Sequence, residues 1–182
     1  MNQKTAMKLF GLLGLLMLLS CGYADRHRNS SSCEQALVDS LEVRVQDSLF
    51  SNVHYSRSQL LEALTQTQDS LVYYRLLALY GKTFFVSSDF DSILYYNRRV
   101  KEFSRNASQS SESLQSPQWN DVLSDVYNIE GNVWMQLNRP DSAIIDYKKA
   151  YGYRLEGKKL HLLPDICINI ACLLYTSPSP RD

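Results

Sequence analysis

The sequence has few of the residue patterns that catalysis and metal binding require. Its 182 residues include only three histidines and four cysteines, with no Cys-x-x-Cys or clustered Cys/His spacing. A zinc site is therefore not expected. A glycine-rich phosphate loop, a paired-histidine motif and a nucleophile elbow are also absent from the sequence. We expect no enzyme activity, and accordingly no catalytic residue, metal, cofactor or small-molecule substrate.

An excess of charge of one sign is also lacking. Lys and Arg number 19, as do Asp and Glu, and without residues 1–20 and 172–182 the net charge becomes −2. This balance gives no electrostatic reason to expect nucleic-acid binding. One basic cluster is expected in the last turns of a helix, where cations suit the helix dipole. It comprises Arg98, Arg99, Lys101 and Arg105, and a phosphate or nucleic-acid role for it is the less favoured alternative.

The N-terminus has the layout of a secretory signal. Residues 1–8 carry Lys4 and Lys8 but no acid, and residues 9–19 are an unbroken run of Leu, Phe, Gly and Met. That run is shorter than the roughly 20 apolar residues of a membrane-spanning helix. It ends at Ser20, a small residue that immediately precedes Cys21.

A small residue followed at once by cysteine resembles the lipobox of bacterial lipoproteins. The resemblance implies cleavage of a signal peptide, residues 1–20, and lipidation of Cys21 by acyl chains such as palmitate. Several chains are needed because a single one binds a membrane only marginally. The protein would then be exported and lipid-anchored in the bacterial cell envelope, facing the periplasm or the cell surface. An ordinary signal that happens to precede a cysteine is the alternative.

The last eleven residues, 172–182, resemble a translated sequencing adaptor. One reading frame of the transposon-end adaptor used in common library kits encodes this stretch, residue by residue. Such scars are excluded from fold reasoning, so we expect the native sequence to end near Ala171 and the domain to be incomplete. With Cys21 and Cys172 set aside, Cys33 and Cys167 remain, and an extended repeat fold would hold them too far apart for a disulfide.

Helical periodicity dominates residues 34–171, after a polar, aperiodic tether at residues 21–33. Apolar residues recur at steps of three and four, as on one helix face, and no alternating strand pattern competes. The predicted fold class is all-α. The first expected helix is an N-terminal stretch that carries Ala36, Leu37, Leu41, Val45 and Leu49 on one face. A polar loop is expected at residues 106–118. The other expected helices cover residues 58–66, 69–86, 90–104, 119–137 and 141–155 and a segment that starts at Leu160 or Pro164.

The chain also repeats itself at an offset of 50 residues. Placing Gly81 over Gly131 aligns two predicted helix pairs without a gap, and Phe84 then meets Trp134. Five Asp-Ser dipeptides, at 39, 47, 69, 91 and 141, fall near predicted helix starts. We interpret them as capping or turn residues rather than catalytic carboxylates.

The second pair, over residues 127–151, resembles the tetratricopeptide repeat (TPR). The resemblance implies stacked antiparallel helix pairs in a right-handed solenoid, in which small residues let helices approach and aromatic residues fill the gaps. The first copy departs from the pattern at Ile93, Asn97 and Val100, and the offset exceeds the usual 34 residues. Another antiparallel helical array is the alternative. The residues assigned to repeat packing are Gly81, Gly131, Trp134, Ala143, Tyr147 and Ala150.

A TPR array implies a concave groove that binds a peptide or a partner helix. The groove positions carried over from the family are Arg75, Lys82, Phe85, Asp125, Asn128, Asn132 and Gln136, with Ala78, Val86 and Met135 beside them. Asn128 and Asn132 could equally be plain exposed polar residues. The expected function is a membrane-anchored scaffold that binds protein or peptide partners in the cell envelope. The alternative is the exported sensor region of a truncated signalling protein, a histidine kinase or a helix-turn-helix regulator.

Overall fold

The computed structural model describes residues 35–49, 51–108 and 116–176. The expected signal peptide at 1–20, Cys21, the tether at 21–33 and residues 177–182 of the tail lie outside the described residues. Across the described residues the regular elements are helices and no strand occurs. The predicted all-α class is confirmed.

The chain divides into two compact units, Met1–Ser40 and Leu41–Asp182. The described part of the first unit, residues 35–40, is helical. The second unit begins with helical residues 41–48 and holds all the elements that carry the candidate site.

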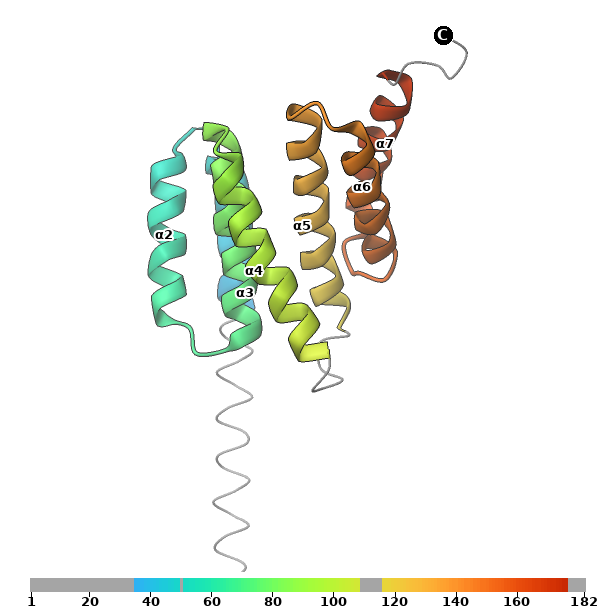
Figure 1. The fold of residues 1–182 in the computed structure, drawn as a ribbon. Coiled ribbons are helices and arrows are strands. Elements are labelled where there is room, and N and C mark those ends of the chain that lie inside the picture. Colours follow the sequence, from blue (N-terminus) through green and yellow to red (C-terminus); the bar gives the residue numbers. More distant parts are fainter. Residues whose placement is uncertain (1–34, 50, 109–115, 177–182) are drawn as a thin grey trace, which may run out of the picture. The chain divides into compact units, whose positions relative to one another are not determined.

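Six α-helices and two short 3-10 helices follow residues 41–48 in the part of the second unit that the structure describes (Figure 1). In chain order they are α2 (Val53–Gln66), α3 (Ser70–Lys82), η1 (Thr83–Ser87), α4 (Phe90–Ser108), α5 (Pro117–Gln136), α6 (Pro140–Leu155), η3 (Leu160–Leu162) and α7 (Leu163–Thr176). Within this unit α3 packs against α2, α4 and α5, and α6 packs against α5 and α7.

The helix starts follow from local side chains. The Asp69 carboxylate accepts from the backbone N–H groups of Leu71 and Val72, at 2.8 and 3.2 Å, and so caps α3. For α5, Ser116 caps the helix and Pro117 occupies its first position, where a missing N–H costs nothing. Among the Asp-Ser dipeptides for which a capping or turn role was predicted, Asp69 is therefore a helix cap, whereas Asp91 and Asp141 lie in the first turns of α4 and α6.

Several predicted boundaries were wrong. Helix α2 begins at Val53 rather than at residue 58, α3 ends at Lys82 and is followed by a 3-10 helix, and α5 begins at Pro117, which was expected in the loop. Residues 106–108, expected in a loop, complete the last turn of α4.

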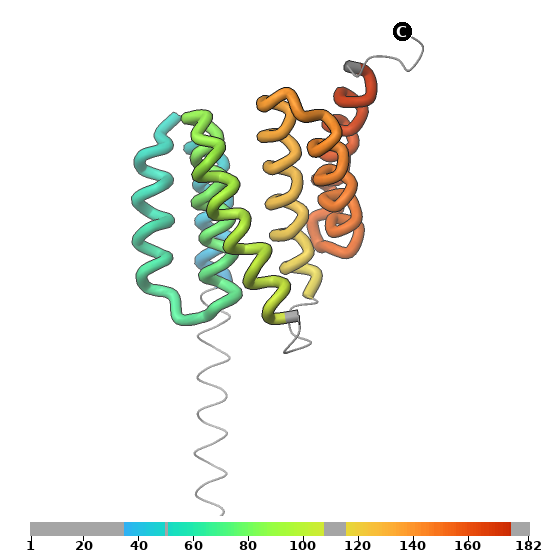
Figure 2. Tube along the Cα trace, in the orientation of Figure 1, coloured from blue at the N-terminus to red at the C-terminus, as the bar shows by residue number. Residues whose placement is uncertain are grey.

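Figure 2 follows the chain through the hairpins α3–α4 and α5–α6, whose turns share features at the 50-residue offset although the 3-10 helix η1 precedes only the first. Ser88 and Asn138 both adopt left-handed backbone conformations, with φ of 53° and 55°. The next residue in each turn donates its N–H back to an aromatic residue's carbonyl, Asp89 to Phe84 at 3.2 Å and Arg139 to Trp134 at 2.8 Å. The two turns therefore share a left-handed residue and a hydrogen bond at the offset of the sequence repeat.

Burial in the two hairpins matches at the same offset. Ile93, Asn97 and Val100 of α4 are completely buried, as are Ala143 and Ala150 of α6, and Tyr147 is 2 % exposed. A separate apolar cluster joins α3, α4 and α5 through Leu77, Val100, Trp119, Val122, Leu123 and Val126. Among the described residues no helix is both long and apolar enough to span a bilayer.

Candidate functional site

One face of α5 carries four of the predicted groove residues. Asp125, Asn128, Asn132 and Gln136 follow one another at steps of three and four residues, so they project from the same side of the helix. Helix α3, which contains Arg75 and Lys82, packs beside α5. We define the α5 face as Asp121, Asp125, Asn128, Asn132 and Gln136.

The middle of the α5 face presents two carboxamides in fixed orientations. The Asn132 side-chain oxygen accepts from the Tyr147 hydroxyl at 2.7 Å. The Asn128 side-chain oxygen accepts from the Asn169 amide of α7 at 3.0 Å. Both oxygens are therefore occupied, and the side-chain N–H groups of Asn128 and Asn132 have no hydrogen-bond acceptor within the described part of the chain. Two donors thus remain about one helical turn apart.

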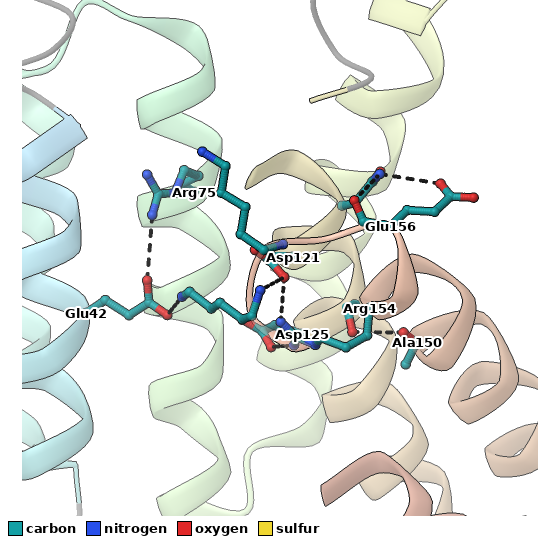
Figure 3. A network of polar contacts seen from close by, with 11 residues as sticks. Glu42, Arg75, Asp121, Asp125, Ala150, Arg154 and Glu156 are labelled. Atoms are coloured by element: carbon teal, nitrogen blue, oxygen red, sulfur yellow. Dashed lines mark hydrogen bonds and ion pairs between the residues drawn. The ribbon is translucent and has the colours of Figure 1, made fainter. Parts of the chain in front are cut away.

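The N-terminal end of the α5 face is occupied by a partly buried ion-pair network (Figure 3). Arg154 of α6 is 1 % exposed. It donates to the Asp121 carboxylate at 2.8 Å and to the Asp125 carboxylate. Asp121 Oδ2 accepts from the Lys158 backbone N–H at 2.9 Å, and Asp121 Oδ1, which also binds Arg154, accepts from the Lys159 backbone N–H at 3.1 Å. Asp121 therefore ties the segment after α6 to α5.

The same network extends to the start of the second unit. The Glu42 carboxylate lies 3.6 Å from the Arg75 guanidinium and also pairs with the Lys159 ammonium group. Figure 3 shows the contact of Glu42 with Arg75; its other contact is with Lys159, whose backbone N–H donates to Asp121. Arg75, predicted as a groove residue, is thus buried and held by an internal partner.

The remaining predicted groove residues lie at helix ends. Lys82 is the last residue of α3 and is half-buried. Phe85 lies half-buried in η1, with its ring 6.4 Å from that of Phe90. Gln136 ends α5 and is exposed.

All the residues assigned to repeat packing except Gly81 lie on α5 and α6. A Cβ atom added to Gly131 would lie 2.4 Å from Cε1 of Tyr147, so only glycine fits against this ring. The Trp134 indole N–H donates to Asp146 at 2.8 Å, and the Ser124 hydroxyl donates to the Ala150 carbonyl at 2.8 Å. In the first hairpin, a Cβ at Gly81 would approach Cβ of Tyr96 to 2.9 Å.

Burial shifts the pKa of groups in these interfaces. It raises the pKa of Tyr147 to about 12, so this hydroxyl stays protonated and remains a donor to Asn132 at any physiological pH. Burial also raises the pKa of the Glu130 carboxyl, and its 2.6 Å ion pair with Lys101 partly offsets the rise. Glu130 is 3 % exposed, which places this acid inside the helix packing.

The described residues hold no group of three or more His, Cys, Asp or Glu side chains that could bind a metal ion. The acids of the α5 face are engaged with Arg154, and Glu130 is engaged with Lys101. What the arrangement offers chemically is hydrogen-bond donation from the two carboxamides.

Sequence reasoning missed Glu42, Asp121, Arg154 and Lys159. Asp121 and Asp125 stand four residues apart, and this spacing could have predicted that the two carboxylates share a cationic partner. The identity of that partner could not be predicted from the sequence, because Arg154 lies 33 residues beyond Asp121.

The chain matches no family model, no curated protein sequence and no solved structure.

Proposed function

We propose that this chain is a protein-binding module of TPR type, tethered to a membrane of the bacterial cell envelope by lipid on Cys21. The peptide-binding part of the proposal depends on one observation, the pair of oriented carboxamides at Asn128 and Asn132. An extended peptide offers a row of backbone carbonyl groups, which are the acceptors that such donors require. The repeated hairpin geometry supports the solenoid arrangement.

The binding proposal is tested with aspartate at the two asparagine positions. Asn128→Asp and Asn132→Asp keep an oxygen acceptor for Asn169 and Tyr147 but remove the free N–H donors. Short random peptides displayed on phage are selected on the wild-type chain, and the affinities of the selected peptides are then measured by calorimetry. Loss of one hydrogen bond, worth about 1 kcal/mol, should weaken binding roughly fivefold, and loss of both should weaken it by more than tenfold.

The matched control is Gln46→Glu, the same amide-to-acid change at an exposed position outside α5. It should leave affinity unchanged, and all three variants should melt near the wild-type temperature. If no peptide is selected, or if the control weakens binding as much as the asparagine variants do, the peptide-binding proposal is wrong.

The tether is tested separately in cells that express the full chain. Cys21→Ser should abolish incorporation of labelled palmitate and move the protein out of the membrane fraction, because no acyl chain could then be attached. Cys33→Ser serves as the control and should keep both label and membrane association. Palmitate incorporation that persists in Cys21→Ser would exclude this cysteine as the anchor.

A further inference from the structure

Helices α4 and α6 lie on either side of α5 (Figure 1) and carry the same kind of exposed stripe at the 50-residue offset. On α4, Tyr95 is 47 % exposed and is followed three residues later by exposed Arg98. On α6, Ile145 is 54 % exposed and is followed three residues later by exposed Lys148. Each helix thus presents an apolar side chain and, one turn on, a cation.

Two further cations converge between these stripes. The ammonium groups of Lys101 and Lys149, from α4 and α6, lie 5.2 and 4.9 Å from the centre of the same Tyr127 ring. The carboxylates that compensate them lie underneath, since the side chains of Glu130 and Asp146 are only 4 % and 11 % exposed. The lysine side chains are themselves 26 % and 49 % exposed, so solvent meets the positive groups.

Exposed acids only partly offset this charge. Glu102 pairs with Arg98 at 4.0 Å, while Asp91 and Asp141 lie in the first turns of α4 and α6, about two turns before the cations. Arg99 turns toward Tyr73 of α3 and does not contribute. We define the basic face as the exposed part of α4 and α6 formed by Tyr95, Arg98, Lys101, Arg105, Ile145, Lys148 and Lys149.

We propose that the basic face binds the surface of an anionic lipid bilayer. Its cations complement phosphate headgroups, and the exposed Tyr95 and Ile145 suit the boundary between headgroups and acyl chains. The lipid tether of the proposed function supplies the reason for this choice of partner, because a chain anchored at residue 21 stays close to such a surface. The inference rests on that tether, but the binding itself is measured without it.

The test uses the chain from residue 21 onward with Cys21→Ser, so that no lipid anchor takes part. Cosedimentation is measured with vesicles of phosphatidylcholine alone and of phosphatidylcholine mixed with phosphatidylglycerol. We expect binding to the anionic vesicles only, weakened by added salt. The triple variant Arg98→Gln/Arg105→Gln/Lys148→Gln changes exposed side chains and should lower the partition coefficient by about a hundredfold, at roughly fivefold per cation near an anionic surface.

The control removes the same number of charges elsewhere, with Arg44→Gln/Arg139→Gln/Lys158→Gln, all exposed in the structure. It should change partitioning by less than threefold, and circular dichroism should show both triple variants folded. Equal losses in the two triple variants, equal binding to neutral vesicles, or no binding by the parent chain would each overturn the proposal. Palmitate labelling of the wild type reports separately on the tether, so a failure of one proposal is distinguishable from a failure of the other.

Discussion

The contact between Gly131 and Tyr147 makes a quantitative prediction about the α5–α6 hairpin. In Gly131→Ala the added Cβ would lie 2.4 and 2.5 Å from Cε1 and Cδ1 of the Tyr147 ring, where about 3.5–4.0 Å is the favourable carbon–carbon separation. The ring must therefore move by about 1 Å, although it is 2 % exposed and its hydroxyl is bonded to Asn132.

The size of the effect follows from opposing contributions. Overpacking costs about 1–3 kcal/mol and loss of the Tyr147–Asn132 hydrogen bond about 1 kcal/mol, whereas alanine gains about 1 kcal/mol over glycine in a helix. We expect Gly131→Ala to lower the free energy of unfolding by about 1–3 kcal/mol. For a domain of this size that corresponds to a fall in melting temperature of roughly 3–10 °C.

Gly152 provides the matched control, because it lies in α6 and nothing stands within 4 Å of its added Cβ. Gly152→Ala should therefore raise stability by up to about 1 kcal/mol through helix propensity alone. Thermal unfolding followed by far-ultraviolet circular dichroism compares the two variants. In a Tyr147→Leu background, which removes the ring, the cost of Gly131→Ala should largely disappear. Equal shifts at both glycines, or an undiminished cost without the ring, would refute the close-approach argument.

Two other changes follow from the described geometry. Ser88→Gly should raise the free energy of unfolding by roughly 0.5–1 kcal/mol, because Ser88 has φ 53° and glycine adopts this conformation without strain. Urea titration measures the change, and a loss of stability would contradict the prediction. The raised pKa of Glu130 implies a contribution to stability that is complete below the ordinary carboxyl pKa of about 4.3 and is lost as pH rises through the folded-state pKa. Glu130→Gln should therefore gain stability relative to wild type as the pH rises above about 4.3, and parallel stability–pH curves for the two proteins would exclude this.

Much of the fold could be predicted from the sequence because it depends on local patterns. Apolar spacing located the helices, and small residues aligned with aromatic ones located the two hairpins. The helical residues 35–48 show the limit of this reasoning. Leu41 and Val45 are buried as predicted, but Leu37 is 46 % exposed and Val38 is buried in its place. Steps of three and four residues fit either of two neighbouring apolar positions, so spacing alone does not decide which of them is buried.

The candidate site was harder to predict because its contacts join distant segments. The pair of asparagines was recognisable from its spacing on one helix. Their orientation was not, because Tyr147 and Asn169, which hold the two carboxamides, come from α6 and α7. A helical pattern also could not show which polar residue has an internal partner and which is available to a ligand, because Asp125 and Asn128 lie on the same face of α5.

This distinction decides where on the α5 face a peptide would bind. At its N-terminal end a ligand would have to displace Arg154 from Asp121 and Asp125, and breaking a buried ion pair such as Arg154–Asp121 costs about 3–5 kcal/mol. At Asn128 and Asn132 it would displace only water, and each hydrogen bond gained contributes about 1 kcal/mol. A peptide carboxylate near Arg75 would likewise compete with Glu42, which is already in place. The balance therefore favours the middle of α5, and it makes Asp125 and Arg75 part of the framework that keeps α5 in position.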